Sequence, residues 1–523
     1  MLKRRDYLFL AVATAIVVLV IVALQPVPGY MDADYYYAGG TQLAQGKGFS
    51  DPFLWNYLDL PEGIPHPSNS YWNPLASMIA AGGMILTGKI NFLSARIGFI
   101  LMALMVPLVV AALSQRITHR RDLALISGIL AIFPGYYLPF VVTTDNYSLY
   151  LLVGALYFLL LTRLTAPKSF LLGSLAGLLN LARGDGLLWL PLTLFAVTVL
   201  AFREYQAEVS WARLRRSVLS ASLVLVGYLL VMGAWLGRDL VAFGTLLPPG
   251  SKPVPWMTSY SQIYTFTPGQ YTFQSLLANG WLAILKMRAK AFWQNLSTAF
   301  LAQGMVFLFP LVVIGAWKVR KLFVVQFGAL GWFILLLAES LLFPFASVNG
   351  GFFHAGTVFQ PLMFVLIPLG LDVLVNRLRE MKHSLRQVSM LLPAVLLIFV
   401  ISLNVMLVKI RVIDSGWNEG EYLYQTADQF LVEQGARPQD VVMVRNPPAY
   451  YIMTGRSTIS IPYGDLETLL AASRKYNAGY IILERDGTPK SLIDLYNHPN
   501  DYPDFAYLGA IGDSRILLIK SAP

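Results

Sequence analysis

The chain of 523 residues contains no cysteine, and only 13% of its residues are charged. The lack of cysteine excludes disulfide bonds, a thiol nucleophile and a cysteine-ligated metal. The lack of charge, set against 56% hydrophobic residues, excludes an ordinary soluble globular protein. The composition is typical of a protein that crosses a membrane several times.

The chain contains long apolar runs. Several are long enough to cross roughly 30 Å of hydrocarbon as a helix, which satisfies its own backbone where water cannot. The first run follows Lys3-Arg4-Arg5 and precedes no small-residue cleavage site, so we interpret it as a retained span and not a signal peptide. About eleven spans are predicted, at residues 7–24, 92–114, 122–139, 147–162, 169–182, 187–202, 218–237, 298–316, 323–342, 358–375 and 388–408.

The basic residues collect in every second loop between these spans, and these loops fall on one side of the membrane. Six short segments hold 19 of the 39 Lys and Arg, which identifies them as cytoplasmic and argues against nucleic acid as the partner of a chain with net charge +10. The protein is thus predicted to be a multi-pass protein of the plasma (inner) membrane with a cytoplasmic N-terminus. The basic segments are residues 1–6, 115–122, 163–168, 203–217, 317–322 and 376–387.

One further apolar stretch, residues 71–90, is predicted to be an interfacial helix. If it crossed the membrane, the basic cluster at residues 116–121 would move outside, which the charge rule disfavours. With this helix outside the count, the odd number of spans makes the C-terminal part extracytoplasmic. The outer loops are then residues 25–91, 140–146, 183–186, 238–297 and 343–357.

The composition becomes ordinary and globular after residue 413. Apolar stretches at residues 440–444, 457–462, 479–484 and 514–520 alternate with helical patterns at 420–434 and 465–476. The alternation predicts a small extracytoplasmic α/β domain, residues 414–523, after an all-α transmembrane domain, residues 1–413. The smaller domain has no phosphate-binding or dinucleotide-binding glycine pattern, so a role in acceptor capture or stability is expected.

Four acids lie in the outer loops, close to the ends of spans. Asp32 and Asp34 follow the first span, and Asp145 and Asp185 lie where the chain next returns to the outer face. At this height a carboxylate base could deprotonate an acceptor hydroxyl that attacks a carbon attached to a lipid-anchored phosphate. The alternatives are helix capping and, for Asp185, a local pair with Arg183.

A phosphate leaving group also needs cationic or hydrogen-bonding neighbours. Arg183 and Lys252 are outer-face candidates, with Lys252 favoured because prolines restrict its loop, and His66 and His354 are neutral donors. Neither histidine belongs to a pair with metal-ligand spacing. The sequence assigns no cofactor, and a divalent metal, Mg²⁺ or Mn²⁺, is left open.

Three motifs occur in an order that resembles the C-type (GT-C) glycosyltransferases, in the branch of lipid A aminoarabinose transferases and protein O-mannosyltransferases. They are Asp32-Ala-Asp34-Tyr-Tyr, Ser70-Tyr71-Trp-Asn73-Pro-Leu and Thr144-Asp145, and the turn Arg183-Gly-Asp185-Gly is also similar. The resemblance covers about residues 1–240. The family's lysine is missing near Trp72 and Asn73.

The resemblance implies an inverting transfer of a sugar from a polyprenyl-phosphate donor to a glycan, lipid or protein acceptor. It makes Asp32 the base, Asp34 the fallback base and Asp145 an acid that orients substrate, and it places Tyr71 and Asn73 at the substrate. A transporter or lipid flippase is the alternative, although no internal repeat supports it. A non-catalytic assembly or sensor protein is a third hypothesis.

Overall fold

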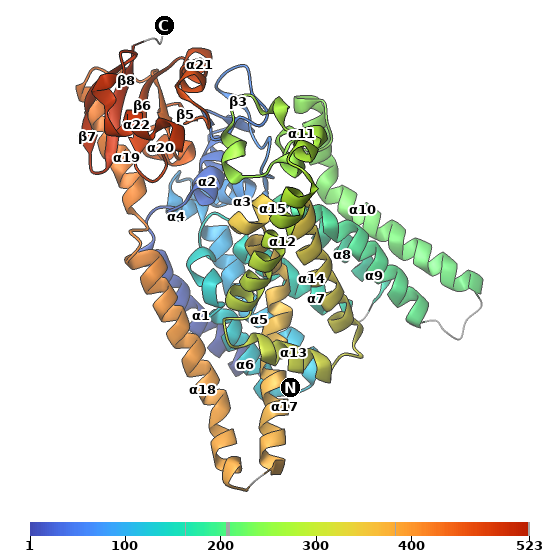
Figure 1. Ribbon diagram of the computed structural model, residues 1–523. Coiled ribbons are helices and arrows are strands. Elements are labelled where there is room, and N and C mark those ends of the chain that lie inside the picture. Colours follow the sequence, from blue (N-terminus) through green and yellow to red (C-terminus); the bar gives the residue numbers. More distant parts are fainter. Residues whose placement is uncertain (163, 205–209, 382, 521–523) are drawn as a thin grey trace. The chain divides into compact units, whose positions relative to one another are not determined.

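The computed structural model describes residues 1–162, 164–204, 210–381 and 383–520 (Figure 1). The chain forms two compact units and passes between them several times. The first unit consists of Met1–Leu24, Gly98–Arg238 and Lys286–Ser415, and the second of Gln25–Ile97, Asp239–Leu285 and Gly416–Pro523. Parts of three predicted cytoplasmic segments, at positions 163, 205–209 and 382, lie outside the described residues.

The first unit is built of helices, as its apolar runs predict. They are α1 (Arg4–Leu24), α5 (Ile97–Thr118), α6 (Arg121–Ile132), α7 (Tyr147–Leu161), α8 (Ala166–Ala182), α9 (Trp189–Glu204), α10 (Ser210–Phe243), α12 (Trp281–Thr298), α13 (Phe309–Lys318), α14 (Phe323–Leu342), α15 (Pro344–Ala346), α16 (Phe352–Gly356), α17 (Gln360–Met381) and α18 (His383–Val408).

Seven segments of the described chain are long and apolar enough to cross a membrane. They are Arg4–Leu24, Ile97–Thr118, Gly184–Arg203, Leu214–Phe243, Phe323–Leu342, Pro344–Glu380 and Leu391–Ile413. Each overlaps a predicted span, and the other four predicted spans overlap the shorter helices α6, α7, α8 and α13. Two of these four overlaps are partial, because α6 ends at Ile132 and α13 begins only at Phe309. The predicted polytopic helical fold is confirmed, and the total of about eleven crossings stays a prediction.

Helices α13 and α17 pack closely because each carries a glycine at their crossing. A Cβ added at Gly315 would lie 2.1 Å from the carbonyl oxygen of Leu366, and one added at Gly370 would lie 2.0 Å from that of Leu311. Since lipid supplies no hydrophobic drive between helices, close backbone contact at small residues is how such helices associate. The two glycines fix this crossing.

The second unit joins loops of the first half of the chain to its C-terminal part. Its helices are α2 (Met31–Ala44), α3 (Leu75–Thr87), α4 (Phe92–Ala95), α11 (Phe273–Ala278), α19 (Glu419–Glu433), α20 (Pro447–Thr454), α21 (Leu466–Tyr476) and α22 (Ile493–Asn497). Its strands are β1 (Ser50–Asp51), β2 (Phe53–Leu54), β3 (His66–Pro67), β4 (Val441–Val444), β5 (Thr458–Ser460), β6 (Ala478–Glu484), β7 (Phe505–Ile511) and β8 (Ser514–Ile519).

The C-terminal α/β fold is confirmed, and its sheet has one strand from the first loop. The order is β2-β5-β4-β6-β8-β7, parallel from β2 to β6 and antiparallel beyond. Strand β2 pairs Phe53 with Thr458 and Leu54 with Ile459. A segment that follows the first span is thereby fixed to the edge of a sheet formed some 400 residues later.

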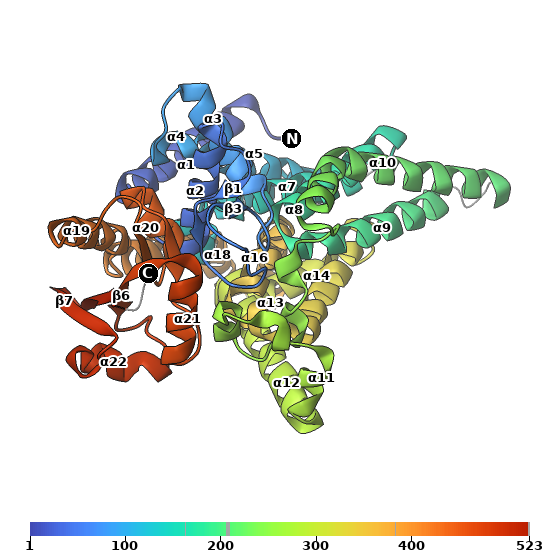
Figure 2. The ribbon, with the colours of Figure 1, turned by 90° about the horizontal axis from the view of Figure 1, so that it is seen from above.

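Helices cover both faces of this sheet. Met443 and Ile481 pack with Leu469 of α21 on one face, whereas Val442 packs with Tyr450 of α20 on the other. Figure 2 shows α19 and α20 on one side of β6 and α22 on the other. Alternate residues of β4 and β6 therefore enter different cores, as a buried parallel sheet requires.

The stretch predicted as an interfacial helix forms α3, which packs on α2 inside the second unit. With 13 residues it is shorter than the helices that qualify as spans. Its length agrees with the prediction that it does not cross the membrane, and its place at the membrane surface stays a prediction.

Candidate active site

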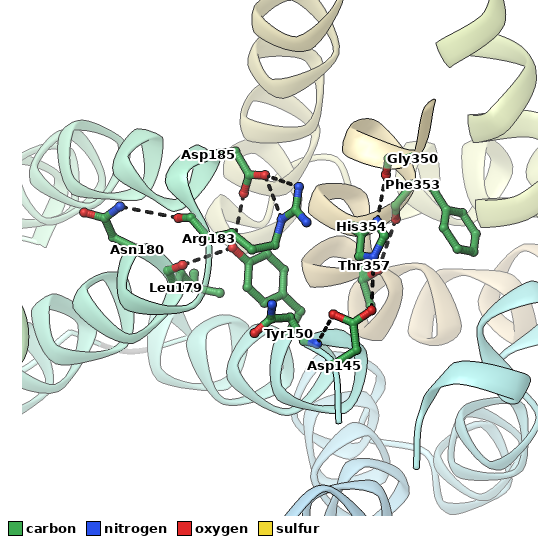
Figure 3. Close-up of polar contacts among 11 residues, drawn as sticks. Asp145, Tyr150, Leu179, Asn180, Arg183, Asp185, Gly350, Phe353, His354 and Thr357 are labelled. Carbon is green, nitrogen blue, oxygen red and sulfur yellow. Dashed lines mark hydrogen bonds and ion pairs between the residues drawn. The ribbon is translucent and has the colours of Figure 1, made fainter. Parts of the chain in front are cut away.

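Three predicted outer-loop positions come together in the first unit. Asp145 lies just before α7, Arg183 and Asp185 lie between α8 and α9, and His354 lies in the short helix α16 (Figure 3). Asp145, Arg183 and Asp185 are placed where apolar helices begin or end, and the short helix of His354 leads into α17. The loops predicted to share one face therefore supply polar groups to one region of this unit.

Asp145 and His354 form a buried pair. Asp145 is 1% exposed, and its Oδ1 accepts from the backbone N–H of Asn146 at 2.6 Å. Its Oδ2 lies 3.3 Å from Nε2 of His354. The imidazole stacks on the ring of Tyr147, with 4.4 Å between ring centroids. The carboxylate is thus fixed by the N–H of Asn146, the imidazole is fixed by the ring of Tyr147, and the two groups lie against each other.

The tautomer of His354 follows from its second contact. Its Nδ1 lies 2.9 Å from the carbonyl oxygen of Gly350, which can only accept, so Nδ1 carries the hydrogen. In a neutral ring Nε2 then has a lone pair that faces an oxygen of Asp145. Two acceptors at this distance repel unless a proton or a metal ion lies between them. A carboxylate oxygen and an imidazole nitrogen are also suitable ligands for a divalent metal.

Arg183 and Asp185 form the local pair that the sequence left open. Nε and Nη2 of Arg183 lie 2.8 and 2.7 Å from Oδ2 of Asp185. Tyr150 donates its hydroxyl to Oδ1 of Asp185 at 3.1 Å and is also 3.0 Å from the carbonyl oxygen of Leu179. The pair is therefore tied to α7 and α8 and is mostly shielded from solvent.

Glu339 is a residue of this region that the sequence analysis missed. It lies near the end of α14, is 4% exposed, and is within range of the charges of Arg183 and Asp185. A Cβ added at Gly351 would lie 3.0 Å from its Oε2. A single carboxylate inside the apolar run 323–342 was the available signal, because intramembrane acids are rare and usually functional.

Asp32 and Asp34 lie in the first turn of α2 in the second unit. Asp32 is partly exposed, whereas Asp34 is completely buried. Nδ2 of Asn446 donates to Oδ2 of Asp34 at 2.8 Å. Burial and the nearby charge of Glu421 raise the pKa of Asp34 well above its usual range. The two acids therefore have different environments, one open to a reactant and one closed inside the fold.

Tyrosine hydroxyls lie near Asp32 in the same unit. Burial and the charge of Asp32 raise the pKa of Tyr264 to about 12, against the opposing charge of Arg445. The backbone of Tyr264 accepts from the N–H of Tyr463 at 2.8 Å, which ties its loop to the C-terminal part. The surroundings of Asp32 thus contain groups from the loop after α10 and from the C-terminal α/β part.

The other predicted binding residues of the second unit differ in exposure. Lys252 is exposed, and its loop lies beside Tyr71, because the N–H of Gly250 donates to the carbonyl oxygen of Ser70 at 2.8 Å. Asn73 is 3% exposed at the start of α3.

His66 is enclosed between strands of the second unit. It is 8% exposed, and its Nε2 lies 3.1 Å from the carbonyl oxygen of Phe53. Its Nδ1 lies 3.8 Å from Oδ2 of Asp59. Burial lowers the pKa of His66, which favours the neutral ring. The ring is thus a part of the fold that carries β1 and β3.

The resemblance to the GT-C glycosyltransferases that was drawn from the sequence is confirmed for the fold by solved structures. No protein-family model and no curated protein matches the chain. Solved structures do match. ArnT from Cupriavidus metallidurans bound to undecaprenyl phosphate has a TM-score of 0.57 at 11% identity, over 99% of this chain and 98% of that chain.

A second solved structure supports the same fold. The oligosaccharyltransferase of Archaeoglobus fulgidus in complex with Zn and sulfate has a TM-score of 0.53 at 14% identity, over 92% of this chain and 68% of that chain. At such low identity the likeness establishes the fold alone. What the chain does has to be argued from its own residues.

Proposed function

We propose that the protein is a membrane glycosyltransferase that moves a sugar from a polyprenyl-phosphate donor to an acceptor at the outer face of the plasma (inner) membrane. The observation that carries the proposal is the buried pair of Asp145, just before α7, and His354, in the short helix α16, within a GT-C fold. The match to ArnT bound to undecaprenyl phosphate supports the donor class. A glycan, a lipid or a protein would be the acceptor.

Asp32 is proposed as the general base. Its carboxylate would take the proton of an acceptor hydroxyl while that oxygen forms a bond to the anomeric carbon of the sugar. The bond from this carbon to the phosphate oxygen would break with inversion, and polyprenyl phosphate would leave with the electron pair. Asp32 is preferred to Asp34 because Asp34 is completely buried and accepts a hydrogen bond from Asn446.

The remaining residues are proposed to bind and orient substrate. Asp145 with His354 would hold polar groups of the donor, as would Arg183 with Asp185. If a divalent metal such as Mg²⁺ or Mn²⁺ is bound, Oδ2 of Asp145 and Nε2 of His354 would be among its ligands, and it would stabilise negative charge on the departing phosphate.

The transporter or flippase hypothesis is weaker on one specific point. Its buried acids should lie in the middle of spans, where they would line a path for the transported group. Glu339 lies close to the end of α14, and Asp145 lies before the start of α7. Acids at helix ends favour chemistry at a membrane surface.

The experiment is a transfer assay with purified protein in lipid. Short-chain polyprenyl-phosphate sugars are offered, and release of polyprenyl phosphate is followed for the wild type, Asp32→Asn and the exposed control Asp501→Asn. If release is lost only in Asp32→Asn, the result supports both the polyprenyl-phosphate donor class and the role of Asp32 as the base. Release that continues in Asp32→Asn rejects the base, and no release by the wild type from a broad panel of sugars rejects the transferase.

A further inference from the structure

The C-terminal α/β part is attached to the helical turn that carries Asp32 and Asp34. Asn446 donates its Nδ2 to Oδ2 of Asp34 at 2.8 Å, and its Oδ1 accepts from the N–H of Ala449, which caps α20. Further along the same two helices, Nε2 of Gln42 donates to the hydroxyl of Tyr451 at 2.6 Å. The connection between β4 and α20 is therefore fixed against the first turn of α2.

Arg445 is the residue directly before this anchor, and its guanidinium is only weakly engaged. Its side chain is 50% exposed, and Nη1 lies 3.9 Å from Oε2 of Glu484. The other oxygen of Glu484 accepts from the hydroxyl of Tyr424. A half-exposed ion pair of this length contributes little, so a stronger anion can replace Glu484.

The stem of Arg445 is nevertheless held in place. A Cβ added at Gly487 would lie 2.3 Å from Cδ of Arg445, so the absence of a side chain at 487 leaves room for this stem. The arginine therefore presents its charge from a supported position, and less rotamer freedom is lost when it binds an anion.

The charge of Arg445 reaches the surroundings of Asp32. The hydroxyl of Tyr264 lies 3.8 Å from the sulfur of Met31, the residue before Asp32. Asp32 raises the pKa of this hydroxyl, and Arg445 lowers it. A phosphate that approached Asp32 without a cation nearby would be repelled, and the planar fork of arginine matches two phosphate oxygens. The family's lysine is missing near Asn73, so the sequence had offered Lys252 as the main cation for this purpose.

We propose that Arg445 of the C-terminal α/β part binds the phosphate group of the polyprenyl-phosphate substrate and product. This inference rests on the proposed function and extends it, because it makes the C-terminal part a contributor to the substrate site. Glu484 holds the guanidinium when phosphate is absent and releases it when phosphate binds. Lys252 would then assist and not carry the binding.

The test measures binding of short-chain polyprenyl phosphate to the full-length protein in nanodiscs of zwitterionic lipid, without turnover. Arg445→Gln should weaken binding roughly tenfold to hundredfold, which is the loss expected for charge-assisted hydrogen bonds. Arg445→Lys should recover part of the loss. Arg474→Gln, a change at an exposed arginine of α21, is the matched control and should bind like the wild type.

A second variant should change the affinity for polyprenyl phosphate in the opposite direction. Unfolding of a variant could not produce such a gain in affinity. Glu484→Gln keeps the acceptor for Tyr424 but removes the competing charge, so it should bind polyprenyl phosphate more tightly than the wild type. Unchanged affinity in both Arg445→Gln and Glu484→Gln would overturn the inference and leave the proposed function standing. A wild type that binds no polyprenyl phosphate would reject the proposed function itself.

A last arm separates the substrate from bulk lipid. If Arg445→Gln lowers the affinity of the nanodisc-embedded protein for a soluble short-chain anionic phospholipid but leaves its affinity for polyprenyl phosphate unchanged, the phosphate bound is a phospholipid headgroup, and the inference is wrong. If Arg445→Gln lowers the affinity for polyprenyl phosphate while the phospholipid composition of the nanodiscs is kept the same, the inference is supported.

Discussion

Nε2 of His354 lies 3.3 Å from Oδ2 of Asp145, while Nδ1 of the same ring lies 2.9 Å from the carbonyl oxygen of Gly350. The carbonyl fixes the hydrogen on Nδ1, so the pair with Asp145 needs either a second proton or a metal ion. A chelator would remove a metal ion from the pair but would not remove a proton, so the two states can be told apart by experiment.

The first prediction separates the metal ion from the proton. If a metal lies at the pair, extensive chelation should lower sugar transfer by at least about tenfold, and Mg²⁺ or Mn²⁺ should restore it. Asp145→Asn should raise the metal concentration needed for half-maximal restoration, because one ligand loses its charge. Full activity after chelation would mean that a proton alone joins the two side chains, and His354→Gln would then be the informative variant.

A second prediction concerns pH and the second unit. Burial and Glu421 raise the pKa of Asp34 well above its usual value of 3.8. The native state therefore holds this proton more tightly than the unfolded chain does. The resulting stabilisation is complete below about pH 3.8 and is lost as the pH rises through the native pKa.

Asp34→Asn should accordingly flatten the decline of stability with rising pH. The amide still offers an oxygen to Nδ2 of Asn446, so the contact between α2 and the β4–α20 connection is retained. The midpoint of thermal unfolding in detergent, followed across about pH 4 to 8, gives the slope for each protein. Equal slopes for Asp34→Asn and the wild type would show that Asp34 is not the titrating group.

A third prediction tests the helix crossing in the first unit. Gly370→Ala would place a methyl group 2.0 Å from the carbonyl oxygen of Leu311, and backbone cannot move aside as a flexible side chain can. Overpacking of this kind should destabilise by about 1–3 kcal/mol or more. Gly233→Ala is the control, because α10 has open space at that position among the described residues.

The control should be neutral or slightly stabilising, since alanine favours a helix over glycine by up to about 1 kcal/mol. Thermal unfolding of the two variants in the same detergent makes the comparison. Equal midpoints would mean that α13 and α17 separate easily, and the crossing would not be a fixed feature of the fold.

The sequence predicted the parts of the fold that depend on local pattern. Apolar runs identified the helices of the first unit, and short apolar stretches identified β4, β5, β6 and β8. Strand β2 was missed because Phe53 and Leu54 are too few to show a period, and their strand exists only through pairing with Thr458 and Ile459. Pairing partners this far apart in sequence leave no local signal.

Some residues of the candidate site were anticipated from the sequence, and others were not. The positions of Asp145, Arg183 and His354 followed from where loops leave the apolar runs. Glu339 was overlooked because the run that contains it was counted as a span, and Arg445 because no motif surrounds it. Their relevance follows from neighbours that only the folded chain supplies, such as Arg183 for Glu339.

The last prediction concerns Glu339, a buried acid near the end of α14. Its carboxyl group is within range of the charges of Arg183 and Asp185, so it is suited to accept hydrogen bonds from substrate hydroxyl groups near that pair. Glu339→Gln should raise the KM for the sugar donor roughly tenfold, because the amide is a weaker acceptor. Glu380→Gln, at an exposed position of α17, is the control.

Gly351 supplies an independent way to reach the same carboxylate. A Cβ at this position would lie 3.0 Å from Oε2 of Glu339 and 3.0 Å from the carbonyl oxygen of Ala346, so Gly351→Ala should displace Glu339 and raise the donor KM. In a double-mutant cycle the alanine should add little once Glu339→Gln is present. Independent, additive effects would instead mean that Gly351→Ala acts on the Gly350–His354 turn, and that Glu339 is a structural partner of Arg183.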